Sequence, residues 1–355
     1  MRTFPEREDQ VRMESRPTDT APPRVAQVQE RLEAALFEIK RVIAGQDQAL
    51  ERVLVCLLSG GHLLIEGVPG LAKTLTIRTV SDVLGGTFGR IQFTPDLVPS
   101  DLVGTRIYRP ATSTRDGSFD TELGPVFCNF LLADEINRAP AKVQSALLEV
   151  MQERQVTIGT ASHAVPDPFL VMATQNPIES EGTYPLPEAQ VDRFMLKVVV
   201  DYPRHDEELT VVHRSLSAPP AVRQVMTVDD LKALQRATRN VYVDPVVAAY
   251  AVALTTATRD PGAHGLPQLK PYIGFGASPR GSINLVHGAR ALALIRGREY
   301  VLPQDVLALA KDVLRHRLVL TYQALAEEVG ADAILDQLVA AITLPRIDMA
   351  REAVA

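Results

Sequence analysis

Short apolar runs alternate with amphipathic stretches through the first two hundred residues of the chain. Between residues 24 and 42, apolar residues recur at three- and four-residue spacings, which predicts a helix, and a second helix is predicted at 46–58. Further amphipathic stretches lie at 71–84 and 141–151. The short apolar runs are at 62–66, 89–93, 130–133, 169–173 and 195–200. Strands that alternate with helices predict an α/β fold whose parallel sheet is covered on both faces.

The pattern changes after residue 203, where the strand-like runs stop. Helices are predicted from there to the C-terminus, at 206–215, 228–239, 245–259, 280–296, 303–319 and 331–342, with a glycine-rich loop at 260–277. Residues 1–23 are charged and rich in Thr and Pro without periodicity, which predicts a disordered tail. The predicted organisation is therefore a tail at 1–23, an α/β core at 24–203 and an all-helical domain at 204–355.

Composition narrows the functional classes. The 355 residues are 46% hydrophobic and carry a formal net charge of -6. This acidic balance argues against a dedicated nucleic-acid binder, whose domain normally has a basic surface. Cys56 and Cys128 lie in apolar runs and are predicted to be reduced thiols of the core. Because we find no signal peptide and no apolar segment long enough to span a bilayer, the protein is predicted to be cytoplasmic.

A glycine-bearing segment joins the first predicted strand to the helix that follows. It reads Glu66-Gly67-Val68-Pro69-Gly70-Leu71-Ala72-Lys73-Thr74. Small residues let backbone N–H groups approach a phosphate, and the start of a helix favours negative charge. Lys73 is predicted to reach the β- and γ-phosphates of a nucleotide and Thr74 to bind Mg²⁺. Ala72 replaces the usual last glycine, which is acceptable if it already lies in the helix; the alternative is a plain turn with a surface lysine.

Two later strands end in polar residues. Asp134 and Glu135 follow the run at 130–133, and Asn176 follows the strand that starts at residue 169. Because ligands of α/β sheets bind at the carboxyl ends of the strands, these side chains are candidates for one site. Asp134 would hold Mg²⁺, Glu135 would act as general base on the attacking water, and Asn176 would orient that water. Taken alone, Asn176-Pro177 is better explained as a plain turn.

Several motifs together resemble the MoxR-type AAA+ ATPases. They are Gly67 to Thr74, Ala133-Asp134-Glu135-Ile136-Asn137-Arg138-Ala139-Pro140, Ala173-Thr174-Gln175-Asn176-Pro177, Asp192-Arg193-Phe194 and Ser278-Pro279-Arg280. The resemblance extends from about residue 25 to the C-terminus. It implies a P-loop AAA+ core with a five-stranded parallel sheet and a helical lid, assembled into a ring, usually a hexamer, with ATP between subunits. It also implies an insert at about 104–126 and a hairpin at about 155–168.

The resemblance also assigns roles to individual residues. Asn176 corresponds to sensor 1, and Arg280 to sensor 2, which is expected to act on the nucleotide of its own subunit. Arg193 corresponds to the arginine finger that reaches a neighbour's γ-phosphate. Arg138 is an alternative finger, and Arg193 has the alternative of a surface ion pair. The nucleotide contacts would extend from Gly67 through Leu75, with Ile43 and Gly45 near the adenine.

Three functions compete at this stage. The first is Mg²⁺-dependent ATP hydrolysis that drives chaperone-like remodelling, assembly or activation of a client protein complex. For that function, the resemblance implies a partner with a von Willebrand factor A domain. The second is a nucleotide-dependent binding switch, against which the Asp134–Glu135 pair argues, because a switch needs no general base. The third is a nucleic-acid motor of the related class with an insert in its second helix, which the acidic charge disfavours.

Overall fold

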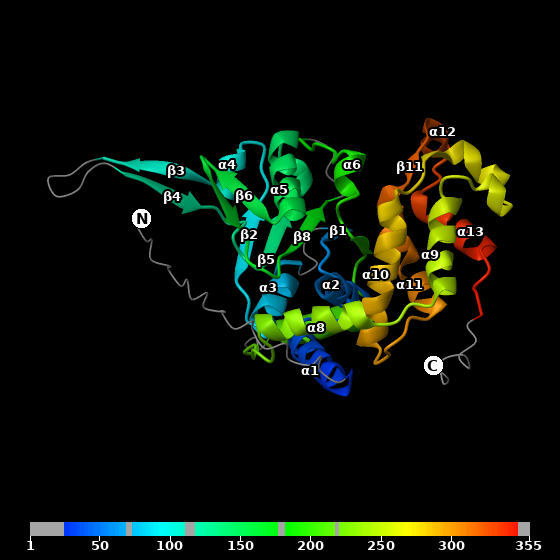
Figure 1. Cartoon of the computed structure of the whole chain (residues 1–355), viewed down its shortest axis with the longest axis horizontal. Coiled ribbons are helices and arrows are strands. Elements are labelled where there is room, and N and C mark those ends of the chain that lie inside the picture. The colour runs from blue at the N-terminus through cyan, green and yellow to red at the C-terminus, as the bar shows by residue number, and fades with distance from the viewer. Residues whose placement is uncertain (1–24, 69–72, 111–117, 177–181, 217–219, 347–355) are drawn as a thin grey trace, which may run out of the picture.

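A computed structural model describes residues 25–68, 73–110, 118–176, 182–216 and 220–346. Its centre is a parallel five-stranded sheet in the order β2-β5-β8-β1-β9 (Figure 1). The strands are β1 (Leu63–Gly67), β2 (Phe88–Gln92), β5 (Phe130–Asp134), β8 (Leu170–Gln175) and β9 (Leu196–Val200). All five strands predicted from the apolar runs, and the α/β class with its parallel five-stranded sheet, are confirmed.

Alternate residues of the central strands pack on opposite faces of the sheet. Leu63 and Ile65 belong to the hydrophobic cluster that includes α2 (Asp47–Ser59) and α3 (Lys73–Leu84). Leu64, between them, belongs to the cluster formed with α5 (Ala141–Glu153) on the other face. Since both faces are buried, β1 and β5 are continuous apolar runs with no polar alternation. Helix α1 (Val25–Val42) packs against α3.

Two hairpins extend from the core. After the short helix α4 (Pro99–Val103), β3 (Gly104–Arg109) pairs antiparallel with β4 (Ser118–Leu123). This hairpin projects far beyond the body of the molecule (Figure 1). The second hairpin consists of β6 (Gln155–Ile158) and β7 (Ala161–Ala164). The first hairpin lies within the insert that the family resemblance implied at about 104–126, and the second lies within the hairpin segment implied at about 155–168.

Helices dominate the chain after residue 203. They are α7 (His205–Ser215), α8 (Val228–Asn240), α9 (Pro245–Ala257), α10 (Pro279–Ile295), α11 (Pro303–Leu314), α12 (Tyr322–Ala326) and α13 (Ala331–Ala341). The predicted helix at 303–319 is too long, because α11 ends at Leu314. A 3₁₀ turn (Arg315–Arg317) follows, and β11 (Val319–Leu320) then pairs antiparallel with β10 (Ile273–Phe275). The C-terminal part is therefore helical apart from this short ribbon.

The helical part shares a hydrophobic core with the α/β part. Helices α8 and α10 pack on α2, and residues of all three helices belong to one buried cluster. A buried ion pair joins the parts, with Arg52 Nε on α2 2.6 Å from Asp312 Oδ2 on α11. The division into a core at 24–203 and a lid at 204–355 stays a prediction, and the predicted tail at 1–23 lies outside the described residues. Among the described residues, no helix has the length and apolar character needed to cross a membrane.

Candidate active site

The sheet order brings the predicted site residues to one edge. Strands β5, β8 and β1 are neighbours and run parallel, so Asp134, Gln175 and Gly67 end them on the same side. Lys73 and Thr74 open α3 directly after the loop that follows β1. Residues 69–72, which include the predicted phosphate contacts Pro69, Gly70, Leu71 and Ala72, lie outside the described part of the chain.

Lys73 lies in the middle of this edge. Its Nζ donates to the carbonyl oxygen of Gly67 at 2.5 Å, across the loop. Burial lowers the pKa of Lys73 below its usual value, against the opposing effect of the Asp134 and Glu135 charges. A half-buried ammonium group near two carboxylates is suited to receive the oxygens of a phosphate chain. Thr74 beside it is half-buried, and Leu75 is largely exposed.

Thr174, which sequence reasoning did not single out, fixes the positions of Asp134 and Glu135. Its hydroxyl donates to Asp134 Oδ1 at 2.7 Å and accepts the backbone N–H of Glu135 at 2.8 Å. Thr174 is only 1% exposed and lies on β8, so these bonds fix the end of β5 to its neighbouring strand. The second carboxylate oxygen of Asp134 pairs with Arg90 Nη2 at 2.8 Å.

Glu135 has an unusual backbone conformation, and its side chain makes two contacts. Its φ of 56° and ψ of 50° place it in the left-handed region, which costs a residue with a side chain roughly 1–2 kcal/mol. The carboxylate oxygen Oε2 accepts from Gln92 Nε2 at 2.9 Å and pairs with Arg138 Nε at 2.8 Å. Such a conformation persists where the surroundings determine it, often in active sites. The geometry gives Arg138 an intrachain partner, and a role for it at a neighbour stays a prediction.

Asn176, which is 8% exposed, lies at the end of β8. It lines a pocket of about 500 Å³ together with Glu66, Asn137, Lys197 and His316. Lys197 Nζ pairs with Glu66 Oε2 at 2.6 Å, so the pocket contains an ion pair beside the residue that precedes Gly67. The structure thus places Asn176 at the same edge as Lys73, Asp134 and Glu135.

Arg193 and Arg280 lie toward the opposite edge. Arg193 precedes β9, and there the backbone N–H of Met195 donates to the carbonyl of His62, just before β1 begins. Ser278 caps α10 by accepting the N–H of Arg280, and Arg280 Nη1 lies 3.5 Å from Asp192 Oδ2. A five-residue strand is about 16 Å long, so about this distance separates the edge near Arg193 and Arg280 from the edge that holds Lys73. The expectation that Arg280 reaches the nucleotide of its own subunit does not fit this geometry.

Asp192 is the centre of a cluster that joins the helical part to the start of β9. Its carboxylate accepts from Ser278 Oγ at 2.9 Å and pairs with Arg317 Nε at 2.8 Å. The Arg317 side chain is 1% exposed and also donates to the carbonyl oxygen of Phe194 at 2.7 Å. Burial lowers the pKa of Arg317 to about 10, and the Asp192 carboxylate partly opposes this shift. Sequence reasoning missed Arg317 because nothing local marks it as buried.

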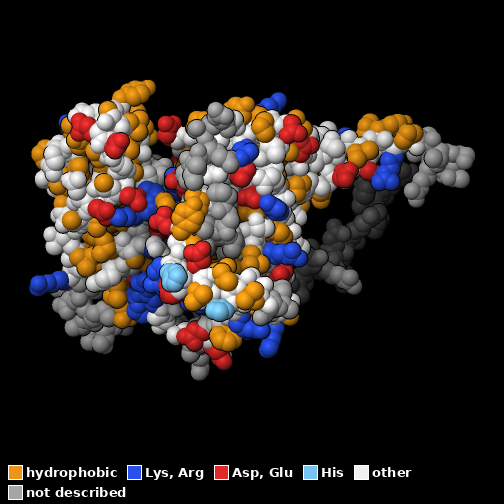
Figure 2. Space-filling model, turned by 180° about the vertical axis from the view of Figure 1, so that it is seen from behind, with side chains coloured by type: hydrophobic (Ala, Val, Ile, Leu, Met, Phe, Trp, Pro, Cys, Tyr) orange, Lys and Arg blue, Asp and Glu red, His pale blue; other side chains and the backbone are white. Residues whose placement is uncertain are grey.

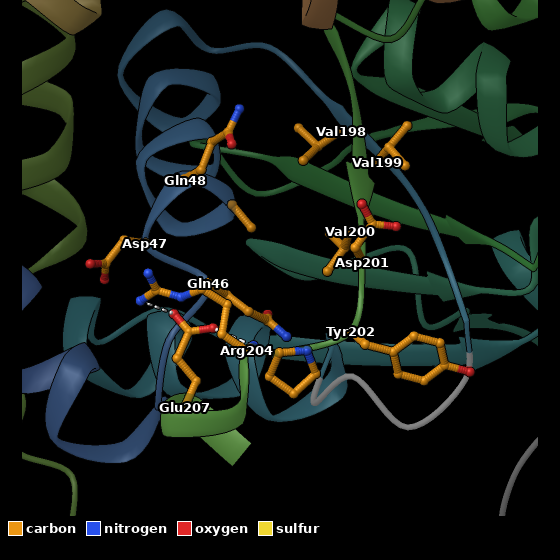
Figure 3. A pocket seen from close by; sticks show the side chains of 12 residues that line it. Gln46, Asp47, Gln48, Val198, Val199, Val200, Asp201, Tyr202, Arg204 and Glu207 are labelled. Carbon is orange, nitrogen blue, oxygen red and sulfur yellow. Dashed lines mark hydrogen bonds and ion pairs between the residues drawn. The ribbon is translucent and has the colours of Figure 1, made fainter. Parts of the chain in front are cut away.

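The segment assigned to the adenine lies beside a second pocket of about 490 Å³, shown in Figure 3. Ile43 is buried, and Gly45 has a φ of 67° that favours glycine. A Cβ atom at residue 45 would also come within 2.8 Å of the Glu207 side chain. In Figure 3, Gln46 lies near Arg204 and Glu207, while residues 198–200 of β9 form another wall. Since Val200 pairs with Gly67, this pocket adjoins the phosphate loop.

The oxygen atoms at the sheet edge suit Mg²⁺. Asp134 and Thr74 offer a carboxylate and a hydroxyl, the hard oxygen ligands that Mg²⁺ prefers, and it commonly takes one or two protein ligands together with phosphates and water. Within the described residues, no group of three or more His, Cys, Asp or Glu forms a metal cage. The donor set therefore fits an ion that is shared with a nucleotide.

Comparisons with known proteins find ATPases of this fold. A family model described as "ATPase family associated with various cellular activities (AAA)" matches residues 62–196, and an AAA lid domain model matches residues 269–338. The chain is 56% identical over 317 residues to "Chaperone MoxR1" of Mycobacterium tuberculosis, which covers 89% of this chain and 83% of that protein. It is 33% identical to "Protein MoxR" of Paracoccus denitrificans, over 89% of this chain and 96% of that protein.

A solved structure from Cytophaga hutchinsonii, described as a "putative ATPase", has the same fold. It superposes with a TM-score of 0.85 at 44% sequence identity, covering 91% of this chain and 97% of the other. The match includes both the α/β part and the helical part.

Proposed function

We propose that this chain, which belongs to the MoxR family of AAA+ ATPases, uses its ATPase activity to remodel, assemble or activate a client protein complex. The observation that carries the proposal is the convergence of Lys73, Asp134, Glu135 and Asn176 at one edge of the sheet, with Thr174 fixing the two acids. The chaperone-like role comes from the relative named as a chaperone.

Each of these residues would have its own role in ATP hydrolysis. Lys73 would neutralise charge on the β- and γ-phosphates, and the loop from Gly67 through Leu75 would wrap them. Glu135 would take a proton from the attacking water, and Asn176 would hold that water in line. Thr74 and Asp134 would hold Mg²⁺, which when bound neutralises charge on the phosphate oxygens. In the described state Glu135 is paired with Arg138, so this ion pair would have to open for Glu135 to bind water.

The proposal includes a site made of two chains. Arg193 and Arg280 cannot serve their own phosphate loop from the far edge of the sheet, but both could serve that of a neighbouring subunit. An arginine supplied in trans stabilises charge on the transferring phosphoryl group and couples hydrolysis to assembly. Such a head-to-tail contact closes into a ring, for which a hexamer is expected. A partner with a von Willebrand factor A domain, and a cytoplasmic location, belong to the same proposal.

The test compares two variants in nucleotide binding, hydrolysis and client capture. Lys73→Ala should lose ATP binding in isothermal titration. Glu135→Gln should keep ATP binding while turnover falls about 10²–10⁴-fold. Glu135→Gln, loaded with ATP, should also retain client proteins that Lys73→Ala does not retain. Unchanged ATP affinity in Lys73→Ala, or capture that is equal for the two variants, would refute the nucleotide site or the chaperone-like role respectively.

A further inference from the structure

Helix α7 is unusually exposed. None of its eleven residues is buried, and only Glu207 and Arg214 are half-buried. Glu207 lies against Gly45, and Arg214 Nη2 donates to the carbonyl oxygen of Lys40 at 3.2 Å. Isolated helices of this length are marginal in water, and helices in proteins gain most of their stability by packing an apolar face. The described chain does not supply that packing for α7.

The apolar face of α7 points away from the rest of the molecule. Leu209, Val212 and Leu216, which we call the α7 stripe, are 50%, 50% and 78% exposed. Their spacings of three and four residues place them on one side of the helix, and at 3.6 residues per turn that side is opposite Glu207 and Arg214. Figure 2, which views the molecule from behind, shows hydrophobic side chains exposed on that face.

We propose that the α7 stripe is the docking surface for a second copy of this chain, namely the copy that supplies Arg193 and Arg280. The inference rests on the two-chain site proposed above. Helix α7 begins five residues after Val200, which pairs with Gly67, so the stripe lies beside the edge that holds the nucleotide. A neighbour that brings arginines to that edge must cover the surface next to it.

The surface around Arg280 is complementary in character to the α7 stripe. Phe275 and Ile283, on either side of Arg280 in the chain, are 75% and 51% exposed. Ile283 is one turn beyond Arg280 in α10 and therefore shares its side of the helix. Charge agrees as well, because the first turn of α7 carries the exposed acids Asp206 and Glu208. Apolar residues with arginine would then meet apolar residues with carboxylates in a head-to-tail contact.

The test uses Glu135→Gln as the parent, since it holds ATP. Leu209→Gln/Val212→Gln is added to it, because glutamine is a good helix former and the substitution leaves α7 intact. Assembly is followed by light scattering with ATP and Mg²⁺ over a range of protein concentrations. The protein concentration at which half of the chains are assembled should be at least about tenfold higher for this variant than for the parent. Nucleotide binding and the melting temperature at low concentration should stay as in the parent. The matched control is Val252→Gln, 48% exposed on α9, which should assemble like the parent.

Each result bears on the proposal. Normal assembly of the Leu209→Gln/Val212→Gln variant would overturn it, as would equal weakening by Val252→Gln. A stripe covered instead by residues 1–24 of the same chain, or by a different protein, would also leave assembly unchanged. Hydrolysis by the protein with native Glu135 is measured in parallel: activity per chain that does not depend on concentration would refute the two-chain site itself, while the ATPase assignment would stand.

Discussion

Arg280 lies 3.5 Å from Asp192, 88 positions away in the chain, and the pair is at the edge of the sheet opposite Lys73. Through Arg317, the same aspartate is bonded to the 3₁₀ turn after α11. Arg280 is thus held by a cluster that also joins the helical part to the start of β9, and Arg193 follows Asp192 directly in the chain.

Thr174 should matter for hydrolysis although it touches no substrate group. Thr174→Val keeps the shape of the side chain but removes the hydroxyl that bonds Asp134 and the N–H of Glu135. Losing a group that orients a metal ligand typically costs about 10–100-fold in activity, so kcat should fall by that amount while ATP affinity changes little. Thr174→Ser, which restores the hydroxyl, should recover most of the activity. A Val variant with normal kcat would show that Thr174 does not position the acids.

Arg317 should be a major source of stability. Arg317→Ala removes a side chain that is 1% exposed and leaves Asp192 and several carbonyl oxygens with fewer partners. Breaking a buried ion pair from one side costs about 3–5 kcal/mol; we expect the lower end, since Ser278 and Arg280 still reach Asp192. Urea unfolding measures this. Arg204→Ala, which loses only surface ion pairs, is the control and should unfold almost like the parent protein.

His62 should make the protein less stable in acid. Its Nδ1 accepts the N–H of Val171 at 3.0 Å, and its Nε2 lies 3.2 Å from the carbonyl oxygen of Met151, so the neutral ring is fully bonded. Burial lowers the pKa of His62 to about 3. The unfolded chain therefore binds an extra proton between about pH 6.5 and 3. The contribution of neutral His62 to the free energy of unfolding is therefore fully present above pH 6.5. It is lost as the pH falls through this window, by up to about 1.4 kcal/mol per pH unit.

His62→Gln isolates this contribution. The variant should be less stable at pH 7, and its free energy of unfolding should depend less steeply on pH between 6 and 4. His205→Gln, on the exposed helix α7, controls for the loss of one histidine. If the free energy of unfolding depended equally steeply on pH in His62→Gln and in the parent, His62 would not be the source of the acid sensitivity.

The sequence predicted the sheet well, because a strand that is buried on both faces needs a continuous apolar run. The five runs correspond to β1, β2, β5, β8 and β9, and the helix starts fell within a residue or two of the observed bounds. The ribbon of β10 and β11 was missed because strands of three and two residues have no local pattern and exist only through pairing with each other.

The site was predicted in part for a similar reason. Strand ends and loop motifs mark Lys73, Asp134, Glu135 and Asn176 locally, so sequence reasoning singled them out, and the structure places them at one edge of the sheet. Thr174 and Arg317 act through contacts with residues distant in the chain. Arg280 was expected at the nucleotide of its own subunit, because no local pattern shows which edge of the sheet it lies at. Only the ion pair of Arg280 with Asp192, shortly before β9, shows that Arg280 lies far from its own phosphate loop.

Mixing inactive subunits tests the two-chain site most directly. Lys73→Ala subunits lack a usable phosphate loop but carry both arginines, whereas Arg193→Ala/Arg280→Ala subunits keep the loop and lack the arginines. Each protein alone should be nearly inactive, since a trans arginine is worth roughly 10³–10⁵-fold in rate in GTPases. In mixed rings some intact loops face intact arginines, so the ATPase rate should recover well above the sum of the two proteins. Rings that exchange subunits and still show no recovery would contradict the account.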